Sequence, residues 1–356
     1  MTEFLMGLPE EEATWYARLA MTFVLCLGAI VGSFLNVCIY RIPLGQSVSV
    51  PRSHCFGCGK TIPWYLNIPL LSWFILRGKC AYCKAPISFR YPAIEGVTAL
   101  LFLLVFQMWG NPELFALNVL PVPELIPFFW LFAASTVVDV MIDFDHRILL
   151  DRISLGGTLL AFAVSAAFPI LHGENVWWQG LSQSLLGGAA GFSLGFIIAW
   201  GGERIFLQDA FGFGDVKWMM LFGAVFGWLG MCYILLLASL IGLVMGAVAL
   251  VVAHCRAVLR EGTPLAIPFG PALGAAALLW LFWGQWIVRG LMCARDWALV
   301  HEDVLMMTAF PLLLAAFGWL IFRIRCIRRA IREETSSETE LEPLSSADRK
   351  ESGHEG

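Results

Sequence analysis

Charged side chains are scarce in this chain and missing from long stretches of it. Only 14% of its 356 residues are Asp, Glu, Lys or Arg, whereas 59% are hydrophobic and the mean hydropathy is +0.75. A soluble globular protein carries about 25% charged residues, so the composition excludes an ordinary soluble domain. An uncharged run of about 20 residues can cross a hydrocarbon core as a helix, and this chain contains several.

The uncharged runs predict nine transmembrane helices. Five runs of single-span length lack charge altogether: 19–40, 153–171, 175–202, 265–288 and 304–322. The run 218–253 is too long for one span, so we expect two helices there with a break near FGWLGM. Two weaker candidates, 92–109 and 125–142, contain Glu95 and Asp139. The sequence therefore predicts an all-α polytopic membrane protein with about eight to nine transmembrane helices.

Basic residues gather on one side of these helices. Seven Lys and Arg lie in 41–91, and the last span continues into RIRCIRRAIR, whereas the alternate connections hold almost none. The positive-inside rule then places the N-terminus outside and the tail in the cytoplasm. We expect no cleavable signal peptide, because the acidic residues 10–12 precede the first helix.

These patterns divide the chain into six segments. We expect an extracytoplasmic N-terminus (1–18), a first transmembrane helix (19–40), a cytoplasmic loop (41–91), a transmembrane core (92–290), an additional helix (291–323) and a cytoplasmic tail that is first basic and then acidic and disordered (324–356).

The cytoplasmic loop contains two C-x2-C pairs. Cys55 and Cys58 are followed, after 21 residues, by Cys80 and Cys83. This spacing is close to that of a zinc ribbon, and four thiolates make a closed tetrahedral site that leaves no position for a substrate. The alternatives are two disulfides, which a reducing compartment disfavours, or four free thiols. The sequence thus predicts a zinc-ribbon-like loop in which the metal has a structural role.

Several aspartates stand where helices reach the cytoplasmic side. Asp215 follows the glycine turn FGFG and precedes the long uncharged run, and VVDVMIDFDHRILLD contains Asp139, Asp143, Asp145 and Asp151. Carboxylates at the membrane border are costly and often functional. Two that meet can divide the work of peptide hydrolysis, because one keeps a proton while the other accepts one from water. Gly212 and Gly214 leave room for an extended substrate. An aspartate at a helix end can also be a simple cap.

Five ordered motifs resemble the bacterial type IV prepilin leader peptidases, which are bifunctional peptidases and N-methyltransferases of the inner membrane. They are GSFLNVCIYRIP, the tetracysteine loop with NIPLLSWFILRGKC, ISFRYPAIE, IDFDHRILLDRISL and IPFGPALG. The turn GFGDVK also looks like that of the Gly-x-Gly-Asp intramembrane aspartyl peptidases. The resemblance implies that prepilin and pseudopilin leaders are cleaved at the cytoplasmic face, and that the new N-terminal residue, usually Phe, is methylated with S-adenosylmethionine.

Carried over by motif, the catalytic residues are Asp143 and Asp215. Asp145 matches a second acid of the motif that is not assigned to catalysis. This chain has Leu150 where the family usually has proline, which removes no chemical group but can shift the start of the next helix. The segment 92–290 then becomes the aspartyl peptidase core, and 41–91 a loop associated with methyl transfer.

The methyltransferase half depends on the resemblance alone, since the chain lacks a glycine-rich strand–turn–helix signature for a nucleotide. The resemblance links Gly78 to methyl transfer, and Glu95 can deprotonate the new α-amine, whose reference pKa is about 8. Alternatively, Glu95 anchors the loop by pairing with Arg90 or Arg41. We count both Gly78 and Glu95 as candidate residues for the cofactor.

Other function classes fit less well. A peptidase without methyl transfer stays an alternative. A proton-coupled transporter should carry acids near the membrane midplane, often with an internal repeat, and a zinc-stabilised scaffold leaves Asp143 and Asp215 without a role. We expect prepilins, pseudopilins and the lipid bilayer as partners, and no nucleic acid.

Overall fold

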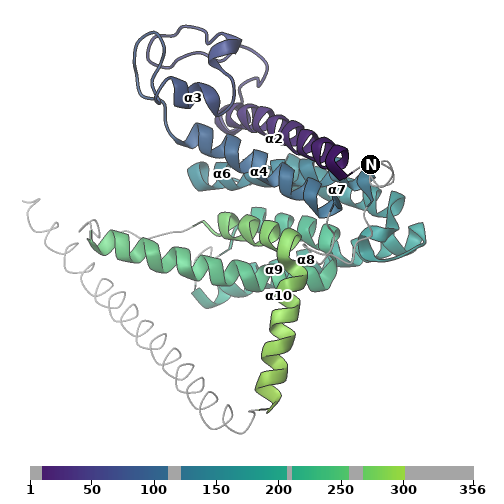
Figure 1. Ribbon diagram of the computed structural model, residues 1–356. Coiled ribbons are helices and arrows are strands. Elements are labelled where there is room, and N and C mark those ends of the chain that lie inside the picture. Colours follow the sequence, from purple (N-terminus) through teal and green to yellow (C-terminus); the bar gives the residue numbers. More distant parts are fainter. Residues whose placement is uncertain (1–9, 111–121, 207–210, 256–267, 301–356) are drawn as a thin grey trace, which may run out of the picture. The chain divides into compact units, whose positions relative to one another are not determined.

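The computed structural model describes residues 10–110, 122–206, 211–255 and 268–300, and all its long elements are helices, whereas the segment between Arg41 and Arg90 consists mostly of turns (Figure 1). The long helices are α2 (Glu10–Arg41), α4 (Arg90–Gly110), α6 (Ile126–His146), α7 (Asp151–Ala167), α8 (Trp177–Phe206), α9 (Phe213–Cys255) and α10 (Gly270–Val300). Shorter elements are η1 (Trp64–Leu66), α3 (Leu71–Ile75), η2 (Pro123–Leu125) and η3 (Pro169–His172). Within the described ranges, extended pairing is limited to two isolated bridges. The all-α prediction is confirmed.

Six of these helices are long and apolar enough to cross a membrane: Thr14–Arg41, Arg90–Met108, Pro123–His146, Trp177–Arg204, Phe213–Ala249 and Gly270–Cys293. The difference from the nine predicted spans has three sources. Residues 153–171 form the shorter α7 of 17 residues and the separate turn η3. The region 218–253 lies within one long element, α9. The predicted span 304–322 lies outside the described residues.

The predicted break in FGWLGM is present in α9. Gly227 has φ 74° and ψ 172°, which are not helical values, so two helical stretches meet there. Such a break interrupts the hydrogen bonding of the helix backbone, and buried carbonyls then need other donors. The Ser184 hydroxyl of α8 donates to the carbonyl of Ala224 at 2.7 Å.

Residues 1–287 form one compact unit, and the described residues 288–300 belong to a second. Within the first unit, small residues allow helices to approach closely, as is usual in membranes. At the α8–α9 crossing, a side chain on Gly187 would overlap the carbonyl of Gly223. Helices α2 and α4 lie side by side, with the loop that carries α3 beyond their ends (Figure 1), and the backbone of Ala99 leaves no room for a side chain on Gly28.

The centre of this unit is built from α6, α9 and α10. Its largest fully buried side chains include Ile142 of α6, Trp218 and Phe222 of α9, and Leu273 and Phe282 of α10. The two predicted catalytic acids stand at the edge of this core, each near one end of its helix.

Candidate active site

Asp143 lies in the last turn of α6. Arg147 ends the helix in the left-handed region, with φ 56°, and its backbone N–H donates to the carbonyl of Asp143 at 2.9 Å. Helix α7 then begins at Asp151, directly after the leucine that stands in place of the proline. Leu150 has φ −80°, close to the value that proline imposes. The Asp143 side chain is buried, with the residue 7% exposed.

Asp215 lies in the first turn of α9. Its backbone N–H donates to the carbonyl of Gly212 at 3.0 Å, which forms the turn by which the chain enters the helix. The residue is 8% exposed, and no hydrogen-bond partner of its Oδ1 atom lies within the described part of the chain. The turn therefore buries a carboxyl group that retains unused hydrogen-bonding capacity.

The two carboxyl groups lie within electrostatic range of each other. Each also lies against a glycine. A side chain on Gly270, the first residue of α10, would overlap Oδ2 of Asp143, and one on Gly212 would stand 3.3 Å from Oδ2 of Asp215. Ends of α6, α9 and α10 thus meet around an acidic pair in which backbone, rather than side chains, approaches the carboxyl groups.

The two glycines before Asp215 differ in their surroundings. A side chain on Gly214 would stand 3.0 Å from Cβ of Leu149, in the connection between α6 and α7. The expectation that Gly214 leaves room for substrate is wrong, because Leu149 fills that space. Gly212 is the glycine that lies beside the Asp215 carboxyl.

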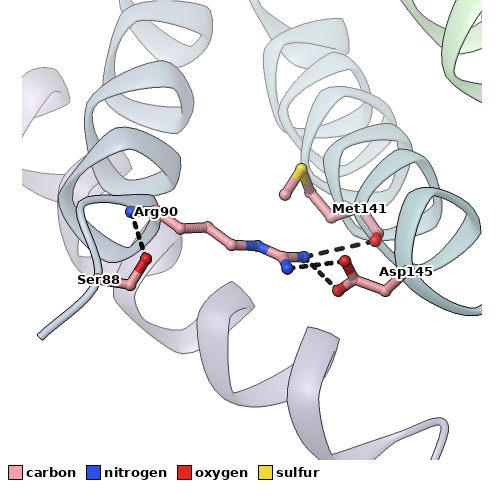
Figure 2. A network of polar contacts seen from close by, with 4 residues as sticks. All are labelled: Ser88, Arg90, Met141 and Asp145. Carbon is pink, nitrogen blue, oxygen red and sulfur yellow. Dashed lines mark hydrogen bonds and ion pairs between the residues drawn. The ribbon is translucent and has the colours of Figure 1, made fainter. Parts of the chain in front are cut away.

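Two ion pairs surround the acids. Arg90, at the start of α4, binds Asp145 with Nη2 2.6 Å from Oδ2, and it also donates to the carbonyl of Met141 (Figure 2). Lys217 of α9 binds Asp151 of α7 at 2.6 Å. These contacts link the helices that carry the acids to their neighbours, and they give Asp145 a role outside the pair.

The four predicted zinc ligands come together. The sulfur atoms of Cys55, Cys58, Cys80 and Cys83 all lie within 4.8 Å of one another, with 3.7 Å between those of Cys55 and Cys83. A Zn–S bond of about 2.3 Å implies about 3.8 Å between sulfurs in a tetrahedral site, so this donor set fits zinc. All four cysteines are free in the structure, so their sulfur atoms are available to a metal.

Two similar turns present these cysteines. Cys55 N–H donates to Lys60 and Cys80 N–H donates to Ala85, and an isolated bridge flanks each turn. The backbone N–H groups of Cys83 and Tyr82 lower the pKa of Cys80 to about 6. The Ala85 amide acts in the same direction on Cys83, but burial and the other cysteines outweigh it and raise the pKa of Cys83 to about 11. The local turns thus favour the thiolate form of Cys80, and a bound cation is needed to keep all four cysteines in the thiolate form.

Gly78 does not present an open face to a cofactor. Its φ is 65°, in the left-handed region, and a side chain there would stand 2.9 Å from Cζ2 of Trp73. The Trp73 indole donates to the carbonyl of Ile87 at 3.1 Å, which closes the turn. Gly78 is needed for this packing, because any side chain at this position would overlap the Trp73 ring.

Glu95 contacts the loop. Its Oε2 accepts a hydrogen bond of 2.7 Å from the backbone N–H of Leu70, and the residue is 9% exposed. The expected partners bind elsewhere: Arg90 binds Asp145, and Arg41 donates to the carbonyls of Ser47 and Pro51. The anchoring alternative therefore involves a backbone amide and not an arginine.

Sequence reasoning missed two neighbours of the acids. The motif IPFGPALG pointed to the family but not to the contact of Gly270 with Asp143, although a glycine before Pro271 at a helix start was visible. Asp139 was read as one charge in a weak span, and it is fully buried one turn before Asp143.

Comparison with known proteins agrees with this geometry. Two family models match in order: the bacterial peptidase A24 N-terminal domain over residues 26–109, and the type IV leader peptidase family over residues 125–247. The first match contains the tetracysteine loop, and the second contains Asp143 and Asp215. No solved structure matches the chain.

Curated relatives carry the same name. A prepilin leader peptidase/N-methyltransferase of Myxococcus xanthus is 37% identical over 237 residues, which are 66% of this chain and 65% of that protein. Its counterpart in Aeromonas hydrophila is 31% identical over 80% of this chain and 98% of the relative. That of Pseudomonas aeruginosa is 32% identical over 76% and 93%. The chain belongs to the type IV leader peptidase family.

Proposed function

We propose that this protein cleaves the leader peptide of type IV prepilins and pseudopilins, with Asp143 and Asp215 as the catalytic pair. The observation that carries the proposal is the meeting of these two buried carboxyl groups, 72 residues apart in sequence, beside the backbone of Gly212 and Gly270. The names of the relatives supply the substrate class.

The pair performs hydrolysis without a nucleophilic side chain. One carboxylate takes a proton from water while the oxygen attacks the scissile carbonyl carbon, and the other, protonated, gives its proton to the carbonyl oxygen. When the tetrahedral intermediate collapses, the C–N bond breaks and the new amine receives a proton. An extended substrate backbone fits the glycine at position 212 beside Asp215, because glycine adds no side chain there.

The second activity is N-methylation of the new N-terminus, as the names of the relatives indicate. A methyltransferase needs a methyl donor, and we propose S-adenosylmethionine for this role. Trp73 covers Gly78, and Glu95 accepts a hydrogen bond from the backbone N–H of Leu70. These residues support methyl transfer by shaping the loop. Cys55, Cys58, Cys80 and Cys83 would hold a zinc ion that stabilises the same loop.

The protein is a multi-pass membrane protein, and we propose the bacterial inner membrane with the acids facing the cytoplasm. The supporting observation is that Asp143 and Asp215 lie at the helix ends that border the basic residues Arg90, Arg147 and Lys217. Counting α7 and the two stretches of α9 as spans gives eight in the described residues, within the predicted range.

The experiment is cleavage of a purified prepilin by Asp143→Asn and Asp215→Asn proteins in detergent. Each variant should lose cleavage by about 10²–10⁴-fold, the usual contribution of acid–base groups. Both should still methylate a pilin supplied without its leader, which reports a folded protein with a separate methylation site. Near-normal cleavage by either variant rejects the catalytic pair.

A further inference from the structure

A third carboxyl group lies directly behind the pair. Asp139 is one helical turn before Asp143 on α6, and it is 0% exposed. Neither of its carboxyl oxygens has a hydrogen-bond partner within the described residues. An ionised carboxylate in such surroundings is very costly, and peptide hydrolysis by two aspartates gives it no task. We therefore expect the buried Asp139 carboxyl group to act through hydrogen bonding.

The facing group comes from the other catalytic helix. The backbone N–H of Leu150, in the connection to α7, and the indole of Trp218 both face the Asp139 carboxyl, and the Nε1 atom of Trp218 likewise has no hydrogen-bond partner in the described chain. Trp218 follows Asp215 by three residues on α9. With a rise of about 1.5 Å per residue, Asp139 lies about 6 Å deeper than Asp143 and Trp218 about 4.5 Å deeper than Asp215. Asp139 and Trp218 thus form a second pair at one depth, below the catalytic pair.

Packing fixes the indole in this place. A side chain on Gly274 of α10 would stand 3.0 Å from Cη2 of Trp218 and would overlap Val140 of α6. On the other side, the ring of Phe222 lies with its centroid 5.1 Å from that of Trp218. These contacts hold the indole between its neighbours, with its N–H toward the Asp139 carboxyl.

We propose that Asp139 is a positioning residue that, through the N–H of Trp218, fixes α6 against α9 and so sets the geometry of Asp143 and Asp215. The inference rests on the proposed function of that pair. Asp139 acts by accepting a hydrogen bond and not by its charge, so the isosteric amide should replace it.

The test compares Asp139→Asn, Asp139→Leu and Trp218→Phe in prepilin cleavage by the full-length protein. Asp139→Asn should keep kcat within about threefold of the parent, whereas Asp139→Leu and Trp218→Phe should lower kcat by about 10- to 100-fold with little change in KM, as expected for a displaced catalytic group. The kcat of the double variant Asp139→Leu/Trp218→Phe should be no lower than that of the more impaired single variant, because both substitutions remove the same interaction. Methylation of a pre-cleaved pilin should be unchanged.

Thr136→Val is the matched control. Thr136 is a buried polar residue on α6, but its hydroxyl donates to Phe132 in its own helix, so its loss should leave kcat unchanged. Wild-type kcat in Asp139→Leu overturns the proposal, as does an equal loss in Asp139→Asn, which would indicate a role for charge. If Asp139→Leu does not accumulate, wild-type kcat in Trp218→Phe overturns it. Activity in Asp143→Asn, measured alongside, would instead reject the catalytic pair itself.

Discussion

Arg90 and Asp145 connect the helix that follows the tetracysteine loop to the helix that carries Asp143. The guanidinium binds both carboxylate oxygens, at 2.9 Å to Oδ1 and 2.6 Å to Oδ2, and the side chains are 35% and 28% exposed (Figure 2). The pair joins the two parts of the chain that the two family models match. Asp145 is also two residues from Asp143, the proposed catalytic acid, so the contribution of the ion pair to cleavage can be measured against that of Asp143.

We expect Asp145→Asn to lower cleavage by no more than about fivefold, because a partly exposed ion pair contributes about 0.2–1 kcal/mol. Asp143→Asn, the neighbouring change of the same kind, should abolish activity in the same assay. Initial rates on a prepilin substrate provide the measurement. A larger loss in Asp145→Asn than in Asp143→Asn would show that the first catalytic acid has been misidentified.

One zinc ion per chain should copurify with the protein, and replacing both Cys80 and Cys83 by serine should remove it. Two thiolates cannot complete the tetrahedral site. Elemental analysis measures the metal, and protease resistance of the loop reports its folding. Cys26→Ser is the matched control, because Cys26 is a free, exposed cysteine of α2 outside the cluster. Undiminished zinc in the double variant would reject the site.

Gly78→Ala should impair methylation more than cleavage. The left-handed φ of 65° costs an L-residue about 1–2 kcal/mol, and the added methyl group meets the Trp73 ring. Gly45→Ala separates these effects, because Gly45 has φ 66° but nothing within 4 Å of the added atom. Methylation of a pre-cleaved pilin and cleavage of a prepilin are measured in parallel. Equal results for Gly78→Ala and Gly45→Ala would show that the contact with Trp73 is unimportant.

Glu95→Gln should retain cleavage and most of the methylation, since the amide oxygen can still accept the hydrogen bond from Leu70. Glu95→Leu leaves that buried N–H unpaired, at a cost of about 1–3 kcal/mol, and should lower methylation selectively. The two variants are compared with pre-cleaved pilin as the substrate. Loss of methylation in Glu95→Gln would favour the alternative in which Glu95 deprotonates the amine.

Gly270→Val should abolish cleavage while the protein still inserts. The added side chain overlaps the Asp143 carboxyl and must displace it, and a shift of about 1 Å at a catalytic group can cost about 100-fold in rate. Gly290→Val on the same helix is the control, because no atom of the described residues lies within 4 Å of a side chain there. Normal cleavage by Gly270→Val would mean that the carboxyl group can move without loss of function.

Features that depend on a few consecutive residues were predictable from the sequence. The two C-x2-C pairs each form a local turn, so their spacing alone identified the four clustered cysteines. The acids Asp143 and Asp215 stood in motifs at the ends of apolar runs, and hydropathy fixes where such runs end. The break at Gly227 followed from an apolar run too long for one span.

Contacts between helices had to come from the tertiary structure. In a membrane protein both the lipid-facing and the buried side of a helix are apolar, so the sequence says little about which residues face a neighbouring helix. The sequence offered Arg90 and Arg41 as ion-pair partners of Glu95, and only the fold showed that its partner is the backbone amide of Leu70. The approach of Gly270 to Asp143, and of Trp218 to Asp139, likewise depends on how α6, α9 and α10 are rotated and packed. Hydropathy determined the depth of each acid, whereas helix packing determined its neighbours.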